Sequence, residues 1–201
     1  MTLNGTNQAN FVDVNGIHFE TVVPQRNITL PARGSKTQVR FDFGIRITNH
    51  TPEMQRFLLF FIRPQFLYAD GTPVWAPMGA NYNQVCVPSL LDFQALEPGQ
   101  HLIVSMHGSF HRRRNQVWFY FLAKDGGSRD WGSFDSGEYL IQVLYENRYA
   151  TWEGVVFSNE HGEFAPSEKC PDSLRSRVDF MSIENVWVGE VATPLVEFNL
   201  N

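Results

Sequence analysis

Apolar and polar residues alternate along residues 37–48, where every second side chain is hydrophobic. The apolar positions are Val39, Phe41, Phe43, Ile45 and Ile47. This period of two is typical of a β-strand that buries one face and exposes the other. Residues 135–147 and 152–158 alternate in the same way, and turn residues separate further short strand candidates at residues 17–23, 27–30, 73–75, 90–96, 101–106 and 186–200.

Two other segments, residues 56–66 and 117–122, are apolar on both faces. Strands of this composition are usually covered on both sides. If both lie in one sheet, the outer face of that sheet is hydrophobic and needs a cover. Either the apolar residues at 180–188 fold back over it, or a second protein subunit does. We assign this interaction face to Phe60, Trp118, Tyr120 and Trp187.

The spacing of the segments predicts an all-β protein, an antiparallel β-sandwich of roughly nine to eleven strands. Residues 1–16 are polar, so we expect a flexible N-terminal arm. Residues 17–159 then form the sandwich domain. Residues 160–201 form a C-terminal extension that packs on the sandwich or extends it, with a short helical turn at residues 172–178.

The motif Asp135-Ser136-Gly137-Glu138-Tyr139 opens one of the alternating strands. It resembles the D-x-G-x-Y sequence before the penultimate strand of immunoglobulin-like domains. The resemblance covers residues 37–159 and implies an immunoglobulin-like sandwich, in which the Tyr139 hydroxyl bonds to the backbone just upstream. Ile141 stands where antibody-type domains carry their second cysteine, so the resemblance implies a sandwich without that disulfide. The segment 117–122 adds a strand to the minimal domain.

Composition and charge limit the class of protein. The chain has 201 residues, 17 of them Phe, and a net charge of −5, which argues against nucleic acid or an anionic membrane surface as partner. No apolar run reaches the roughly 20 residues of a membrane span. The polar N-terminus predicts no secretory signal. We therefore expect a cytoplasmic protein in which Cys86 and Cys170 are free thiols.

The sequence lacks the arrangements that catalysis requires. It contains no G-x-S-x-G nucleophile motif and no phosphate-binding glycine loop before a helix. The acidic residues Asp130, Asp135 and Glu138 fall in turns, where solvated carboxylates are common. We expect no enzymatic activity and no cofactor.

Three clusters remain as candidate binding residues. Trp75, Met78 and Tyr82 lie in an irregular loop, residues 75–88, that suits a small molecule or a sugar. His107 and His111 are four residues apart, about 13 Å on a strand, so we expect no metal site there. Arg112, Arg113 and Arg114 form a basic patch that suits an anion, or a solvated connection between strands.

These observations favour a non-enzymatic protein-interaction or assembly module that uses its apolar sheet face, with a protein partner or a second copy in a homodimer. The alternative is a ligand-binding accessory domain for a sugar, peptide or metal. That function would use the loops at residues 75–88 and 101–111.

Overall fold

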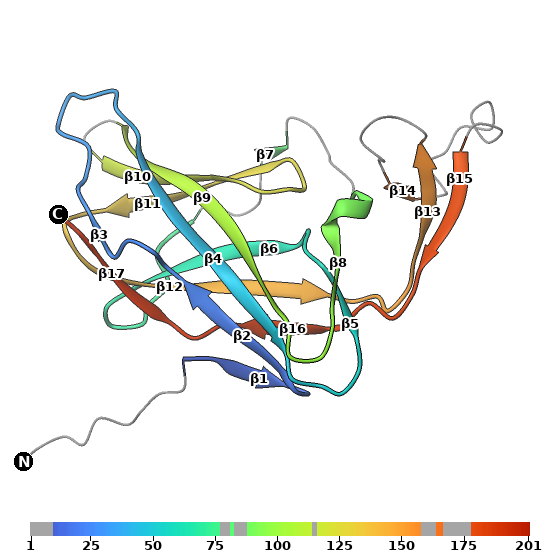
Figure 1. Cartoon of the computed structure of the whole chain (residues 1–201). Coiled ribbons are helices and arrows are strands. Elements are labelled where there is room, and N and C mark those ends of the chain that lie inside the picture. The colour runs from blue at the N-terminus through green and yellow to red at the C-terminus, as the bar shows by residue number, and fades with distance from the viewer. Residues whose placement is uncertain (1–9, 77–80, 83–87, 114–115, 158–163, 167–177) are drawn as a thin grey trace, which may run out of the picture.

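The chain is all-β, as the sequence predicts. The computed structural model describes residues 10–76, 81–82, 88–113, 116–157, 164–166 and 178–201 (Figure 1). Within these ranges it contains seventeen strands and one short 3₁₀ turn. None of the described helical segments is long and apolar enough to cross a membrane. The predictions for Met78, Cys86, Arg114, Cys170 and the helical turn at residues 172–178 fall outside the described residues.

The larger sheet has seven strands in the order β1-β2-β4-β9-β10-β11-β7, and every neighbouring pair is antiparallel. Its centre is the long pair β4 and β9. The strands are β1 (Val12–Val14), β2 (Ile17–Val22), β4 (Val39–Asn49), β9 (His101–Arg113), β10 (Gln116–Leu122), β11 (Gly127–Phe134) and β7 (Asn81–Tyr82).

The second sheet is built around β12, which carries the alternating pattern that follows the D-x-G-x-Y motif. On one edge β12 pairs with β6, and on the other it pairs with β17 and β16 in succession. β17 pairs in turn with β3 in parallel orientation. The strands are β6 (Ile62–Tyr68), β12 (Gly137–Asn147), β16 (Gly189–Ala192), β17 (Val196–Leu200) and β3 (Asn27–Ile28).

Two small sheets complete the molecule. One pairs β5 (Gln55–Leu58) with β8 (Phe93–Leu96), which follows the 3₁₀ turn η1 (Leu90–Asp92). The other has the order β14-β13-β15 and comprises β13 (Trp152–Phe157), β14 (Phe164–Pro166) and β15 (Val178–Ile183). This three-stranded sheet projects beyond one end of the sandwich (Figure 1).

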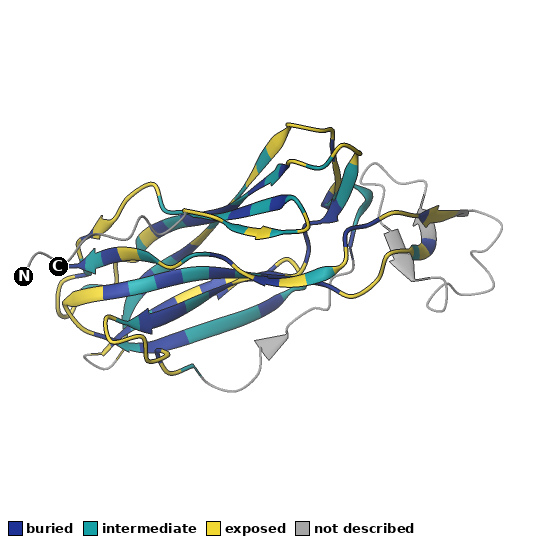
Figure 2. Ribbon diagram, turned by 90° about the horizontal axis from the view of Figure 1, so that it is seen from below, coloured by how far each residue is buried: buried dark blue, intermediate teal, exposed yellow. Residues whose placement is uncertain are grey.

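Phenylalanine rings join the two large sheets. Phe41 of β4 stacks on Phe198 of β17 with ring centroids 4.9 Å apart, and Phe66 of β6 meets Phe119 of β10 edge-on at 4.7 Å. All four side chains are fully buried. Buried and more exposed residues alternate along the strands, as the period of two requires (Figure 2). The two sheets therefore pack face to face around one core.

The segment 56–66 is not one strand. β5 ends at Leu58, a turn follows at residues 59–61, and β6 begins at Ile62. Apolar residues on both of its faces are buried. Phe57 belongs to the main core, and Leu58 and Phe60 pack with Ile183 and Val186 of the C-terminal part. The segment 117–122 forms β10 in the other large sheet. The two segments therefore do not share one sheet, and the condition for a single hydrophobic outer face is not met.

Two further boundaries differ from the prediction. Residues 12–14, assigned to a flexible arm, form β1, because Asn15 and Gly16 both adopt positive φ and close a hairpin onto β2. Residues 127–134 form β11, so Asp130, which was expected in a turn, lies in a strand, as does Glu138 in β12. Residues 160–201 extend the sandwich through β16 and β17, whose Phe198 and Leu200 are buried in the core.

The Tyr139 hydroxyl makes the contact that the D-x-G-x-Y motif implies. It accepts a hydrogen bond from the Asp135 backbone N–H at 3.0 Å and donates one to the Asp135 carbonyl at 3.2 Å. Burial raises the pKa of Tyr139, so the phenol stays protonated and keeps its donor. This contact fixes the loop that enters β12.

Thr193 holds the chain at the interruption between β16 and β17. Its backbone N–H donates to the Val143 carbonyl at 3.0 Å, and its side-chain hydroxyl accepts from the Val143 N–H at 2.8 Å. Pro194 follows and has no N–H to continue the ladder. The buried hydroxyl thus replaces a backbone acceptor for the central strand of the second sheet.

We expect Thr193→Val to lower the free energy of unfolding by roughly 1–3 kcal/mol, because the buried Val143 N–H loses its acceptor while the side-chain shape is kept. Urea titration measures this. Thr48→Val, on the outer side of β4, is the matched control and should change stability by less than about 0.5 kcal/mol. Equal stability of the two variants would show that the Thr193 hydroxyl is dispensable.

Candidate functional site

β9 is much longer than its neighbour β10. β10 pairs only with the second half of β9, from Gly108 to Arg113. The first half, from His101, pairs with β4 on one side. In the part of the chain that the structure describes, no strand pairs with the other side of residues 101–107. Residues 101–107 of β9 therefore form an open edge, although β9 is an interior strand of the largest sheet.

The backbone groups that face this edge follow from the ladder with β4. The Asn49 N–H donates to the Gln100 carbonyl at 2.9 Å, so the Gln100 carbonyl points toward β4. Successive residues of an antiparallel strand direct theirs to opposite sides. Ile103, Ser105 and His107 therefore present their N–H and C=O groups to the open edge.

A groove of about 580 Å³ runs along residues 104–107 of the open edge and continues beside Gly108 and Ser109. We call it the edge groove, and it includes side chains from both faces of the sheet, which is possible because the sheet is interrupted there. Val104, Met106 and Phe121 line its inner side, and Tyr120 and Leu122 its outer side. Its other wall is the turn between β5 and β6, with Leu59, Phe60 and Ile62.

Two hydrogen bonds fix the rim of the edge groove. Lys124 Nζ donates to Asp92 Oδ1 at 2.5 Å, which ties the β10–β11 turn to η1. The Leu59 N–H donates to the Asp92 carbonyl at 2.7 Å, which ties the β5–β6 turn to the same residue. The two walls are therefore held at a set separation, and the groove exists before any ligand binds.

The open edge lacks the devices that usually prevent strand pairing. Native edges are protected by Lys, Pro, bulges or inward-pointing charges. The sequence His-Leu-Ile-Val-Ser-Met-His at residues 101–107 contains no Pro, Lys, Arg, Asp or Glu. Ile103 is 46% exposed on its outer side. Such a segment is chemically ready to accept another strand.

The four residues predicted to form one interaction face do not all lie together in the structure. Tyr120, 37% exposed, lies at the edge groove, and Phe60 lines its wall although it is itself buried. Trp118 lies beside them on β10. Trp187 is not part of any exposed face: it is buried in the core, where it stacks on Tyr145 at 5.5 Å. The sequence alone does not distinguish a Trp in the core from a Trp on an exposed face, so this assignment was wrong.

The predicted ligand loop meets the interaction face. Trp75, 59% exposed, contacts the Trp118 ring edge-on at 5.9 Å, and its carbonyl accepts from the Gly132 N–H at 3.1 Å. A Cβ on Gly132 would come within 2.7 Å of the Trp118 ring, so this position requires glycine. Tyr82 lies in β7, and nothing is described of its side chain.

The histidines and arginines lie on β9 itself. Residues 109–113 continue the strand, so the expectation of a solvated connection is wrong for Arg112 and Arg113. Arg112 Nε donates to the Pro31 carbonyl at 2.5 Å, which makes it a structural contact. His107 pairs with Asp42 across the sheet and His111 with Trp118. The described residues contain no group of three or more potential metal ligands.

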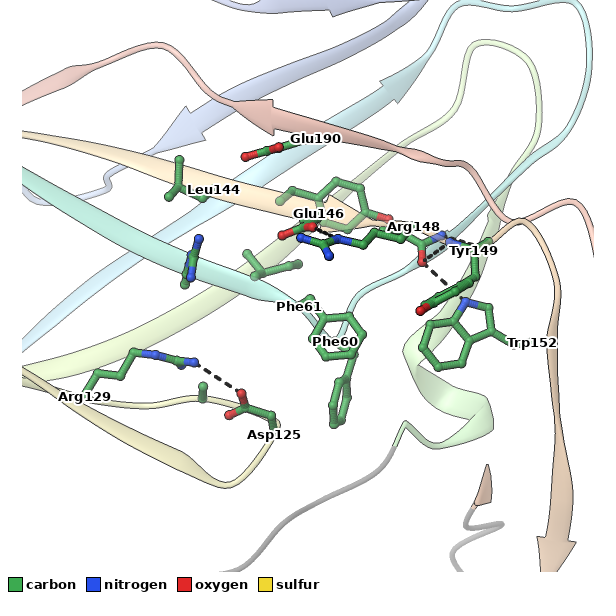
Figure 3. A pocket seen from close by; sticks show the side chains of 15 residues that line it. Phe60, Phe61, Asp125, Arg129, Leu144, Glu146, Arg148, Tyr149, Trp152 and Glu190 are labelled. Atoms are coloured by element: carbon green, nitrogen blue, oxygen red, sulfur yellow. Dashed lines mark hydrogen bonds and ion pairs between the residues drawn. The ribbon is translucent and has the colours of Figure 1, made fainter. Parts of the chain in front are cut away.

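A second cavity, of about 270 Å³, lies where β12 leaves the sandwich for β13. We call it the aromatic pocket. In Figure 3 the Arg129–Asp125 pair lies on one side of Phe60 and Phe61, and Tyr149 and Trp152 lie on the other. Arg63, Leu144, Glu146, Arg148 and Glu190 also line it.

Buried Asn147 positions the aromatic side of this pocket. Its Nδ2 donates to the Tyr149 carbonyl at 2.9 Å and to the Trp187 carbonyl at 2.7 Å. Its Oδ1 accepts from Trp152 Nε1 at 3.4 Å. One strand-terminal amide thus joins the core to the chain that carries both rings.

The edge groove was missed by sequence reasoning because it depends on unequal strand lengths. The signal that could have found it is the absence of charged residues and proline from residues 101–107. The aromatic pocket had no comparable signal, since its residues come from separate strands and turns.

No protein-family model matches the chain, and no curated protein matches its sequence significantly. Function therefore has to be inferred from the geometry of these two sites.

The amide protons of Ile103, Ser105 and His107 should exchange with solvent much faster than those of Leu102, Val104 and Met106, which face β4. We expect a difference of roughly 100-fold or more, because only the second set is held in the central ladder. Hydrogen exchange followed by NMR measures each amide. Uniform protection of all six would show that the edge is not open.

Tyr145 lines the aromatic pocket but is fully buried, and this burial raises its pKa above the usual 10.0. The folded state holds the phenolic proton more tightly than the unfolded chain. The resulting stability is present below pH 10 and is lost at higher pH, by up to about 1.4 kcal/mol per pH unit.

Unfolding of the wild type and of Tyr145→Phe should therefore diverge between pH 9 and 11, with the variant losing less stability. Tyr149→Phe, at an exposed tyrosine, is the control and should follow the wild type. Parallel curves for all three proteins would contradict the effect of burial on Tyr145.

Proposed function

We propose that this protein is a non-enzymatic interaction module that binds an extended polypeptide segment by adding it as a strand to the open edge of β9. The observation that carries the proposal is the edge at residues 101–107, with which no described strand pairs. Residues 104–107 of this edge lie in a largely apolar groove that Arg40 and Lys124 also line. Strand addition uses backbone hydrogen bonds for affinity and side-chain pockets for specificity.

The dimensions of the edge define the ligand. Seven residues of strand span about 23 Å at 3.3 Å per residue, so a segment of similar length would fill the space between the end of β10 and the turn before β9. Alternate side chains of that segment would point inward, toward Val104, Met106 and Phe121. The others would lie beside Tyr120 and Leu122. A bound segment with few charges and with apolar residues on both of its faces would match both sides of the groove.

A free segment fits the edge groove better than a second copy of this chain. The edge is recessed between the β5–β6 turn and the β10–β11 turn, which are fixed through Asp92. Two identical recessed edges cannot approach closely, because their walls meet first. A homodimer that pairs these edges would need both walls to move, whereas a flexible segment enters without that cost.

The immunoglobulin-like resemblance is compatible with this role. The hydrogen bonds between Tyr139 and Asp135 support kinship with that superfamily. Sandwiches of this kind serve mainly as scaffolds for recognition, and function is set by sites placed on them. Here the site is a strand edge.

We expect Ser105→Pro to abolish strand addition while leaving the fold intact. Proline removes the Ser105 N–H that faces the groove, and edge strands accept proline because no ladder bond is lost. The probe is a phage-displayed library of random 12-residue peptides, selected on immobilised protein. Peptides with alternating apolar residues should be enriched, and Ser105→Pro should weaken their binding roughly tenfold or more.

Ser105→Thr, which keeps the N–H, is the matched control and should bind like the wild type. His107→Pro repeats the test at a second outward-facing N–H, and thermal unfolding checks that each variant is folded. The proposal fails if no peptide is enriched, or if both proline variants bind as tightly as wild type. A wild-type dimer that becomes monomeric on Ser105→Pro, measured by light scattering, would instead identify a second copy as the occupant.

A further inference from the structure

The charges around the aromatic pocket are balanced. Three arginines (Arg63, Arg129, Arg148) and three acidic residues (Asp125, Glu146, Glu190) line it. Arg129 pairs with Asp125 at 3.3 Å, and Arg148 Nε pairs with Glu146 Oε1. A strongly charged ligand would gain from one set and be repelled by the other. The lining thus favours a neutral ligand that has many hydrogen-bonding groups.

The ion pairs also fix the direction of these groups. Arg148, held through its Nε by Glu146, keeps its terminal N–H groups as donors. Glu146 and Glu190 face each other as cross-strand neighbours of β12 and β16, so two acceptors project from adjacent strands. Donors and acceptors are therefore interleaved along one side of the pocket.

The aromatic rings on the other side contact one another: Phe61 is inclined by 31° to Trp152, and Tyr149 meets Trp152 edge-on at 89°. Trp152 lies 6.2 Å from Phe61 and 5.6 Å from Tyr149, measured between ring centroids. These distances are those of rings in contact, so no cation fits between them as it does in an aromatic cage. Phe61 is 42% exposed and Tyr149 is 61% exposed. The rings offer a hydrophobic platform to a ligand with a flat apolar face.

We propose that the aromatic pocket binds a neutral carbohydrate. A sugar ring has a C–H face that packs on aromatic rings and a rim of hydroxyls that both donate and accept. This combination matches the platform and the interleaved polar side chains. A proline-rich peptide would use the platform but leave the charged side chains without partners. The volume of about 270 Å³ is at the small end of ligand sites, which suits one or two sugar units.

The geometry needs no rearrangement on binding. Asn147 holds both the Tyr149 carbonyl and the Trp152 indole, and Trp152 also contacts Phe93 at 6.1 Å. Rings that are already in place lose little conformational freedom when a ligand binds. The pocket shares Phe60 and Ile62 with the wall of the edge groove. Its charged side chains and its exposed rings lie outside that groove, so this inference does not depend on the function proposed above.

A glycan array containing neutral, sialylated and sulfated oligosaccharides tests the proposal with the full chain. We expect binding to neutral glycans, followed by titration calorimetry with the best of them. Tyr149→Ala should weaken that binding roughly tenfold, or about 1.4 kcal/mol, because the side chain supplies an exposed part of the platform. Tyr149→Phe keeps the ring and should bind within about twofold of wild type.

Trp75→Ala removes an exposed aromatic ring outside the pocket and is the matched control, with no expected change. Raising the salt concentration from 50 to 500 mM should alter the affinity by less than about twofold, since a neutral ligand is not screened. The proposal is overturned by an absence of neutral glycan binding, by binding restricted to acidic glycans, or by unchanged affinity in Tyr149→Ala. Peptide binding at β9 should be the same in Tyr149→Ala and wild type.

Discussion

Aromatic packing between the two large sheets is the interaction on which the rest of this molecule depends. Phe41, Phe66, Phe119 and Phe198 come from four strands that are far apart in sequence, and their rings form one buried layer. Removing one such ring typically costs about 3–5 kcal/mol, which is a large part of the stability of a domain. Because this layer fixes the sheets relative to each other, strand ends and turns at the periphery are held in place without needing to be buried themselves.

Both candidate sites arise at that periphery, where the regular sandwich is incomplete. The edge groove exists because β9 continues past the end of β10. The aromatic pocket exists because β12 leaves the sandwich and Asn147 turns the chain. The two sites differ in chemistry: one offers unpaired backbone groups between apolar walls, and the other offers balanced charges beside exposed rings. An added strand would replace water as the hydrogen-bond partner of the open edge, and a ligand would cover the exposed aromatic surface.

The all-β class, the alternating strands β2, β4 and β12, and the Tyr139 contact were predictable because each depends on local sequence. Period-two alternation encodes which residues face the core, and the D-x-G-x-Y motif encodes a contact only four residues long. The division of residues 56–66 into β5 and β6 was not predictable, since a run of apolar residues reads the same for one doubly covered strand as for two strands joined by a buried turn. Trp187 was misplaced for the same reason, because an indole is equally apolar in a core and on an interaction face.

The sequence by itself determined that this chain folds into strands, which faces of most strands are buried, and that it carries more aromatic surface than one core face needs. Only the tertiary structure decided where that surface went. Residues 117–122, whose two apolar faces first suggested a partner, are buried on one side in the phenylalanine layer and leave Tyr120 and Leu122 exposed beside the open half of β9. The physical reason is that the hydrophobic pattern of a strand specifies which of its faces is buried. The length and register of strand pairing decide whether an edge is left open, and these depend on contacts between strands that are distant in the chain.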